Sequence, residues 1–580
     1  MCASSVFAAT AATPDAEIES KINALLAKMT LEEKIGQLNQ QTGTGYSDDM
    51  VGSIRKGAVG SILNEVDPVI VNKLQHEAVE NSRLGIPLIF ARDVVHGFKT
   101  IFPIPLGQAA SWNPALVEQG ARIAAVEAAS TGVRWTFSPM VDVSRDGRWG
   151  RIAESFGEDP YLASVLGVSM VKGYQTDDLS QPGTMAACTK HFAGYGASES
   201  GKDYNTTWIP EVLLRDMYLP PFEAAARAGS ATFMCSFNDI NGVPSSGNPH
   251  LNIDILRNEW GFDGVLVSDW ASIMQMIPQG VCVDLKDAAD RAANSGVDVD
   301  MESYAYTRHL KELVEEGKVE ESTIDNLVRN VLRLKFRLGL FDNPYVDMAT
   351  ANNFYAPESL EAAKKMVEES TVMLKNNDIL PLKNVKKIAL VGPMADDKHN
   401  QAGTWCFDLE KEHCVTPLEA LTEKYGKDAI IYAPGLKYSR DIDESGIADA
   451  VAAAREADVV VMVGGEEAVL SGEAHCRADI SLPGAQTKML EALKATGKPV
   501  VLIIMTGRPM TIVHETNLAD AVLYMFHGGT MAGPAVAEML AGEVSPSGKL
   551  PVSMPKMVGQ LPLYYNHVNT GRPASGMVLI

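Results

Sequence analysis

Short apolar runs alternate with amphipathic stretches through the first 340 residues or so. The candidate strands are the apolar runs at 86–90, 135–140, 185–192, 231–237 and 265–269. Between several of them lie segments with apolar residues at helical spacing, such as 114–130 and 211–228. This alternation of strand and helix predicts a parallel sheet or barrel, and its length of about 320 residues suits a (β/α)8 barrel with insertions.

The first helix is expected at residues 18–36. Ile18, Ile22 and Leu25 keep helical spacing there, and Thr30 with Glu33 forms the sequence pattern of a capping box that restarts the turn.

A second α/β series follows a break rich in Asn, Pro and Tyr. We interpret residues 341–356 as a linker between domains, with a TIM-like barrel at 18–340 and a smaller parallel-sheet αβα sandwich at 357–560. Its predicted strands are the apolar runs at 387–393, 429–433, 459–465, 499–507 and 521–526.

The two ends of the chain carry separate expectations. Residues 1–17 are rich in Ala, Ser and Thr and resemble the tail of a secretory signal, which predicts export from a bacterial cell to the periplasm or the medium. The alternative is a disordered leader or a remnant of cloning. Residues 561–580 are expected to form a C-terminal tail.

Composition limits the function classes. The 580 residues are 46% hydrophobic, with a mean hydropathy of -0.02, which indicates globular protein in two or three domains. With 50 Lys and Arg against 73 Asp and Glu, the net charge of -23 disfavours nucleic acid and anionic lipid as partners. The sequence contains no run of 18 apolar residues, so no membrane-spanning segment is expected.

Seven cysteines cannot all pair. Cys406 and Cys414 could close a small disulfide, although free thiols are the more common outcome. No Cys/His cluster has metal-ligand spacing, so neither a metal nor a cofactor is expected.

Asp269 stands where the apolar run 265–268 ends, directly before Trp270. The carboxyl ends of barrel strands carry the chemistry in such folds, and a carboxylate beside a flat aromatic suits a sugar ring. The alternative is an Asp that caps the next helix.

Other polar residues lie near the ends of the predicted strands: Asp93, Arg151, Lys190 and His191. Singly, each has an ordinary interpretation, such as a helix cap for Asp93, a satisfied core histidine for His191, or a salt bridge from Arg151 to a nearby glutamate. Together with Asp269 they would place two carboxylates, a lysine, a histidine and an arginine on one rim. That set can hydrogen-bond several hydroxyls, which predicts a polyol ligand.

The ordered motifs of the chain resemble the β-glucosidases of glycoside hydrolase family 3. They include KMTLEEKIGQL, RDVVHG, GRWGRIAESFGEDP, CTKHFAGYG, MCSFNDINGVPSS, GFDGVLVSDW and PSGKLPVSMP, and they run over nearly the whole length. The resemblance implies a TIM-like barrel followed by an αβα sandwich, an active site between them, and a retaining double-displacement mechanism. Relatives usually continue into a fibronectin-like third domain, which we expect to be either lost or truncated here.

The resemblance assigns roles by position in these motifs. Asp269 corresponds to the catalytic nucleophile and Asp93 to the carboxylate that binds the outer hydroxyls of the sugar, while Trp270 would wall the leaving-group side. The remaining substrate-binding positions are Arg151, Lys190, His191, Met234 and Phe237. Phe237 stands where many relatives have Tyr, so a hydroxyl able to touch the nucleophile is missing.

The acid/base catalyst of this family is commonly a Glu on a loop of the second domain. Glu466, Glu467 and Glu473 follow the predicted strand at 459–465. Glu473 fits best by its distance before Arg477, Asp479 and the Leu482–Pro483 pair, whereas the other two are expected to be structural. The alternative for Glu473 is a solvated surface acid on a mobile loop.

Retaining hydrolysis needs an ionised nucleophile and a protonated acid roughly 5 to 5.5 Å apart. We expect Lys190, His191 and Arg151 to keep Asp269 ionised, and partial desolvation to hold the proton on Glu473 near neutral pH.

The predicted function is therefore exo-acting release of terminal β-D-glucose from β-glucosides and short oligosaccharides. A β-xylosidase or an N-acetylglucosaminidase is the alternative within the family. A Schiff-base aldolase using Lys190 and a sugar-binding pseudoenzyme are remote alternatives. A homodimer is possible, whereas the preferred linkage cannot be read from the sequence.

Overall fold

The computed structural model describes residues 16–572. Nearly all of the predicted leader, and the tail beyond 572, lie outside the described residues. The single helix expected at 18–36 is two helices, α1 (Ala16–Leu26) and α2 (Leu31–Gln37). Thr30 and Glu33 do form the predicted capping box, with each side chain accepting from the other residue's backbone N–H, and it begins the second helix rather than continuing the first.

Eight parallel strands form the barrel in the first part of the chain. Hydrogen bonding gives the order β10-β1-β2-β3-β4 in one arc and β5-β6-β9 in another, and parallel bridges Trp135 to Ala186 and Val267 to Val299 join the arcs into a ring. The predicted TIM-like barrel is confirmed. The strands are β1 (Asn39–Thr42), β2 (Ser61–Leu63), β3 (Ile89–Arg92), β4 (Trp135–Thr136), β5 (Cys188–Phe192), β6 (Thr232–Cys235), β9 (Val265–Val267) and β10 (Asp300–Met301).

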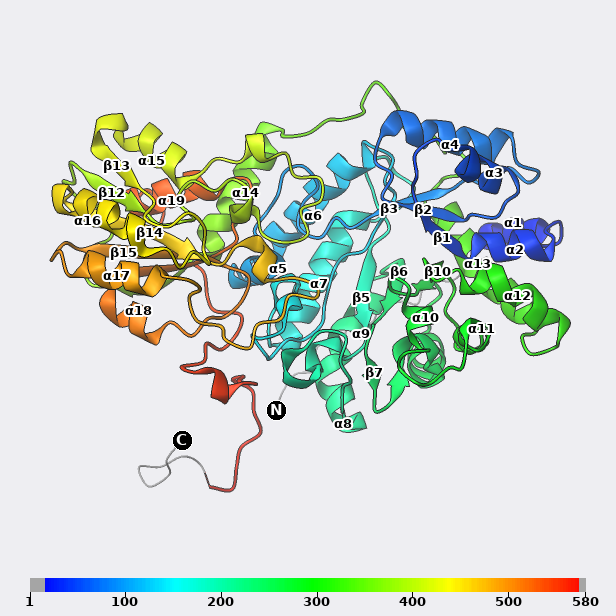
Figure 1. Ribbon diagram of the computed structural model, residues 1–580. Helices are drawn as coiled ribbons and strands as arrows, with labels where there is room; N and C mark the ends of the chain where they lie inside the picture. The colour runs from blue at the N-terminus through cyan, green and yellow to red at the C-terminus, as the bar shows by residue number, and fades with distance from the viewer. Residues whose placement is uncertain (1–15, 573–580) are drawn as a thin grey trace, which may run out of the picture.

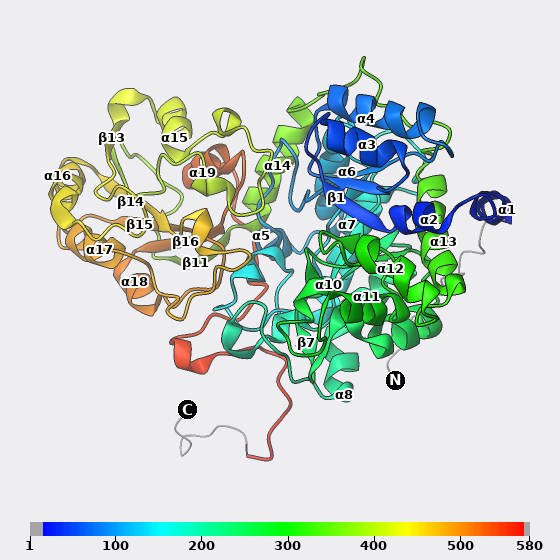
Figure 2. The ribbon, with the colours of Figure 1, turned by 45° about the vertical axis from the view of Figure 1, so that its right-hand side comes forward.

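Helices surround this ring, as Figures 1 and 2 show. Several begin with a side-chain cap followed by proline, at Asp67, Asn113 and Asp159, a combination that sets the first turn without losing a hydrogen bond. The main barrel helices are α3 (Asp48–Arg55), α4 (Pro68–Glu80), α6 (Pro114–Ala129), α7 (Pro160–Gln175), α9 (Pro220–Arg227), a π-helix (His250–Glu259), α11 (Leu285–Asn294), α12 (Ala305–Glu315) and α13 (Glu321–Arg337).

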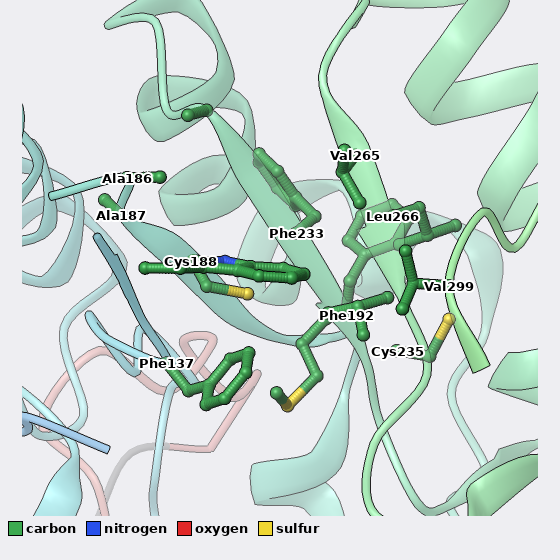
Figure 3. Packing of buried hydrophobic residues seen from close by; sticks show 14 of the residues in the cluster. Phe137, Ala186, Ala187, Cys188, Phe192, Phe233, Cys235, Val265, Leu266 and Val299 are labelled. Atoms are coloured by element: carbon green, nitrogen blue, oxygen red, sulfur yellow. The ribbon is translucent and has the colours of Figure 1, made fainter. Parts of the chain in front are cut away.

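Buried apolar side chains pack closely around the barrel strands (Figure 3). Phe192 and Phe233 pack on Phe222 of α9, between the strands and the surrounding helices. Inside the barrel, the Trp135 indole of β4 donates to the Thr232 hydroxyl of β6 at 2.8 Å. A packed interior, rather than a pore, is what a parallel barrel of this size requires. The chemistry is therefore confined to the rim of the barrel.

The second part of the chain is a three-layer sandwich, as predicted. Its sheet has the order β11-β16-β15-β14-β12-β13, with only β11 antiparallel. One face packs on α14 (Pro357–Ser370), α15 (Pro417–Tyr425) and α19 (Ala532–Ala541), and the other on α16 (Ile447–Glu456), α17 (Gln486–Lys494) and α18 (Val513–Leu518). The strands are β11 (Val372–Asn376), β12 (Ile388–Val391), β13 (Ile430–Ala433), β14 (Val459–Gly465), β15 (Val500–Thr506) and β16 (Ala521–Phe526).

The strand order of this sheet determines which loops meet the barrel. β12 pairs with β13 on one side and β14 on the other, so the order reverses beside it, and ligands of open α/β sheets bind at such a switch point. The long loops that leave β12 and β14 at this point supply Trp405 and Glu473 to a cavity at the barrel rim. In both views the sandwich lies beside the barrel, with α5 (Pro105–Ala110) and α14 between them.

Cys406 and Cys414 are both free thiols, so they form no disulfide. Between residues 16 and 572, no helix combines the length and apolar character needed to cross a bilayer.

Candidate active site

A cavity of about 660 Å³ opens at the carboxyl ends of the barrel strands, under the loops of the sandwich. Eight of the nine predicted site residues line it: Asp93, Arg151, Lys190, Met234, Phe237, Asp269, Trp270 and Glu473. His191 is the exception, because it is wholly buried and reaches the site only through Asp269. The residues expected on one rim are thus brought together around one cavity.

Asp269 follows β9 and is only 7% exposed. Its Oδ1 accepts a hydrogen bond from the Trp270 backbone N–H at 2.7 Å, while Oδ2 has no partner within the described residues. The short helix α10 (Ser272–Gln275) has no side-chain cap hydrogen bond, so Asp269 does not cap it. Trp270 is 44% exposed at the mouth of the cavity.

Burial raises the pKa of Asp269 to about 8, with the Glu473 carboxylate adding to the effect and Arg151 and Lys190 opposing it. The expectation that its neighbours keep Asp269 ionised is wrong, because burial outweighs them. Burial is the largest influence, and His191 contributes no charge because burial and the two neighbouring cations hold its pKa well below the usual range.

His191 connects Asp269 to a second buried carboxylate. Its Nδ1 lies 2.9 Å from Asp142, and its Nε2 lies 3.7 Å from Asp269 Oδ2 without a hydrogen-bond partner. A neutral ring that donates from Nδ1 to Asp142 has only an acceptor at Nε2. Nε2 therefore presents an acceptor towards Asp269 Oδ2, and both atoms are buried without a hydrogen-bond partner in the described residues.

Two cationic side chains also line the cavity. Lys190 Nζ lies 3.2 Å from Asp93 Oδ1 and 5.1 Å from the centre of the Trp405 ring. Arg151 is bidentate on Glu154, at 2.8 and 3.1 Å, so the salt bridge anticipated as its ordinary role is present. It nevertheless also faces the cavity, with Nη1 3.7 Å from Glu473 Oε2.

The three glutamates after β14 occupy different environments. Glu473 lies in the cavity, 2.6 Å from the Tyr204 hydroxyl. Glu466 is buried between Arg508 and Arg477, and the Thr506 hydroxyl donates to it. Glu467 accepts from Ser439 at 2.7 Å and from Arg440 at 3.0 Å. Of these three glutamates, only Glu473 lines the cavity and can reach a molecule bound there.

Glu466→Gln should destabilise the fold, because it leaves the buried Arg508 guanidinium without its counter-charge. We expect a loss of about 3 to 5 kcal/mol in the free energy of unfolding, measured by urea denaturation. Glu467→Gln is the matched control. Its partner Arg440 is half exposed, so water can replace the carboxylate and the loss should be about 1 kcal/mol or less. Equal losses in the two variants would contradict this account.

The loop that carries Glu473 crosses the barrel at very close range. The Gly472 backbone N–H donates to the Gly150 carbonyl at 2.7 Å, and the Arg477 N–H donates to the Arg148 carbonyl at 3.0 Å. A Cβ on Gly150 would meet the Gly472 and His475 carbonyl oxygens at 2.3 and 2.4 Å. Glycine is required at position 150 by this backbone contact.

Several cavity residues were not predicted from the sequence: Asn64, Arg92, Tyr204, Gln279, Trp405 and Phe407. Trp405 and Phe407 come from the loop after β12, and Arg92 holds that loop by an ion pair with Asp408 at 2.9 Å. A polar loop of this length gives no periodic signal. The only available hint was an aromatic pair in an otherwise polar segment.

Comparison with known proteins gives concordant matches. The profile of the Glycosyl hydrolase family 3 N terminal domain matches residues 30–334, and that of the C-terminal domain matches residues 371–577. A periplasmic β-glucosidase of Salmonella typhimurium is 41% identical, over 97% of this chain and 77% of that protein. A β-xylosidase of Formosa agariphila is 34% identical, over 96% of this chain and 76% of that protein. The β-glucosidase of Listeria innocua, solved with isofagomine, superposes with a TM-score of 0.92 at 39% identity, covering 96% of this chain and 79% of that one.

Proposed function

This chain belongs to glycosyl hydrolase family 3, and from that premise we propose that it is a retaining, exo-acting β-glucosidase. It releases terminal non-reducing β-D-glucose from β-glucosides and short β-gluco-oligosaccharides. The observation that carries the proposal is a single cavity holding Asp269 from the barrel and Glu473 from the sandwich. Each domain supplies one carboxyl group, so neither domain alone should turn over normally.

We assign Asp269 as the nucleophile and Glu473 as the acid/base. Asp269 attacks the anomeric carbon while Glu473 protonates the leaving oxygen, which gives a covalent glycosyl-enzyme. Glu473, then ionised, takes a proton from water as that water displaces Asp269. Attack requires the ionised form of Asp269, which Arg151 and Lys190 favour against burial, the influence that raises its pKa.

Unpartnered polar atoms around the cavity support a sugar ligand. Arg151 Nη1, His191 Nε2 and Asp269 Oδ2 are buried without hydrogen-bond partners in the described part of the chain. Such atoms are costly unless a ligand or water satisfies them, and a sugar offers several hydroxyls that both donate and accept. We propose that the Asp93 and Lys190 pair binds the outer hydroxyls, and that Met234, Phe237 and Trp270 form apolar walls.

The substrate assignment is tested by comparing aryl β-glucoside, β-xyloside and N-acetyl-β-glucosaminide at equal concentration. The glucoside should have the highest kcat/KM, because the Asp93 and Lys190 pair suits a sugar with several outer hydroxyls. A 2-fluoro-glucosyl inhibitor should label Asp269, as read by peptide mass spectrometry. A higher kcat/KM for the xyloside would instead favour the xylosidase alternative, which family relatives make reasonable.

The remote alternatives make different predictions. A Schiff-base aldolase needs a free amine, whereas Lys190 is paired with Asp93, and borohydride with a carbonyl substrate should trap no adduct. A pseudoenzyme would bind glucose and give no labelled Asp269. We therefore propose a glycoside hydrolase rather than an aldolase or a sugar-binding pseudoenzyme.

We also propose a cellular location and an oligomeric state for this protein. The Salmonella typhimurium relative is periplasmic, which supports export of this chain to the periplasm or the medium. We also propose the domain limits 18–340 and 357–560, and a homodimer, which sedimentation velocity can test.

A further inference from the structure

The side chain of Tyr204 reaches from the barrel to the carboxyl group of Glu473. Tyr204 lies in the loop between β5 and α9, and its hydroxyl is 2.6 Å from Glu473 Oε1. The other oxygen, Oε2, lies 3.7 Å from Arg151 Nη1. Glu473 belongs to the sandwich, yet both of its carboxyl oxygens lie next to side chains of the barrel.

The backbone holds Tyr204 in an unfavourable conformation. Its φ of +63° is in the left-handed region, which a bulky residue adopts only where its surroundings impose it. Asp203 supplies that restraint, because its carboxylate accepts from Trp149 at 3.0 Å and from the Tyr195 hydroxyl at 2.5 Å. Its second oxygen accepts from the Ala474 backbone N–H at 2.7 Å. One carboxylate therefore fixes both Tyr204 and the residue next to Glu473.

The phenol is a donor at every working pH. Burial and the Glu473 carboxylate raise the pKa of Tyr204, so the hydroxyl keeps its proton and donates it to Oε1. Its ring packs edge-on against Phe237, with centroids 5.1 Å apart. The direction of the hydrogen bond and the position of the ring are both set by the protein.

We propose that Tyr204 is a positioning residue that aims the Glu473 carboxyl group into the cavity. The inference rests on the proposed acid/base role of Glu473. The Tyr204 hydroxyl holds Oε1 by one hydrogen bond, and Arg151 lies beside Oε2. Restraint of both oxygens fixes the orientation of the carboxyl group towards the bound substrate.

Other ionisable groups also lie near Glu473. From the barrel these are Arg151, Asp269 and Asp203, the last through its bond to Ala474. His475 and Cys476 lie on the same loop as Glu473. None of these groups is altered by removal of the Tyr204 hydroxyl, so a Phe substitution isolates one hydrogen bond.

The test is the dependence of kcat/KM on the leaving group in Tyr204→Phe. With cellobiose, whose leaving oxygen needs a proton, we expect about a tenfold fall, because the hydrogen bond that orients the Glu473 carboxyl group is lost. With an activated aryl glucoside, formation of the glycosyl-enzyme should change less than about twofold. Tyr161→Phe, at a tyrosine that is 78% exposed, should match the wild type on both substrates. An equal fall on both substrates in Tyr204→Phe would overturn the inference.

A double-mutant cycle with Glu473→Ala separates positioning from direct contact with substrate. If Tyr204 acts only through Glu473, Tyr204→Phe should change kcat/KM less than about twofold in the Glu473→Ala background. A full tenfold effect in that background would mean that Tyr204 touches the substrate, and the inference would fall. Wild-type turnover by Glu473→Ala alone would instead remove the acid/base assignment, which is a separate failure visible without any Tyr204 variant.

Discussion

Asp269→Asn should abolish hydrolysis and at the same time make the folded protein more stable. Loss of a nucleophile removes the covalent pathway, so kcat should fall by about 10⁴-fold or more for every glucoside, with good and poor leaving groups alike. Steady-state rates and the absence of 2-fluoro-glucosyl labelling check this. A variant that keeps measurable labelling elsewhere in the chain would show that the nucleophile is another residue.

The stability gain follows from the pKa of Asp269, which burial raises from an ordinary value of 3.8 to about 8. The folded state therefore holds a proton that the unfolded chain releases. Stability from this group is fully present below about pH 4 and is lost as pH rises to about 8. Asn does not titrate, so the variant should exceed the wild type by several degrees in unfolding temperature at pH 8 and by much less at pH 5.

The control for this measurement is Asp254→Asn, at an aspartate whose side chain is 66% exposed. Its unfolding temperature should follow that of the wild type at both pH values. If Asp269→Asn were less stable than the wild type at pH 8, the buried carboxyl group would be a structural element rather than a strained functional one.

Glu473→Ala should discriminate between substrates by their leaving groups. Hydrolysis of cellobiose, whose leaving oxygen needs a proton, should fall by about 10² to 10⁴-fold, while formation of the glycosyl-enzyme from an activated aryl glucoside should change little. Azide should attack the glycosyl-enzyme in place of base-activated water and give β-glucosyl azide. Rate measurements over a leaving-group series and product analysis with azide check both expectations.

Glu467→Ala is the matched control, since Glu467 bonds Ser439 and Arg440 outside the cavity. It should keep the wild-type dependence on leaving group. If Glu473→Ala cleaved cellobiose at the wild-type rate, the acid/base assignment would be wrong and the carboxylates that remain in the cavity would need the same test.

Periodicity in the sequence was enough to predict the barrel and the sandwich, but not all of their strands. β1 reads Asn-Gln-Gln-Thr and β10 has only two residues, so neither produces an apolar run. Their positions follow from pairing, with Asn39 opposite Asp300, which closes the ring. The split between α1 and α2 was likewise hidden, because apolar spacing continues across the break.

Site residues next to strands were predictable, and those on long loops were not. Asp93, Lys190 and Asp269 are placed by β3, β5 and β9, whose carboxyl ends meet at one rim. Tyr204 and Trp405 depend instead on left-handed backbone turns and on contacts between segments far apart in sequence. The pKa of Asp269 was also misjudged, because the degree of burial is a property of the assembled site.

The contact at Gly150 makes the two domains a single unit for recombination. The proposed linker at 341–356 would be a natural point at which to exchange sandwiches between relatives. A foreign sandwich joined there would still have to pass its glutamate-bearing loop over Gly150, where no side chain fits, and onto the Asp203 carboxylate. A displacement of about 1 Å in that loop is enough to cost about a hundredfold in rate. Productive crossovers should therefore exchange the paired segments 147–151, 203–204 and 472–477 together, whichever domain each belongs to.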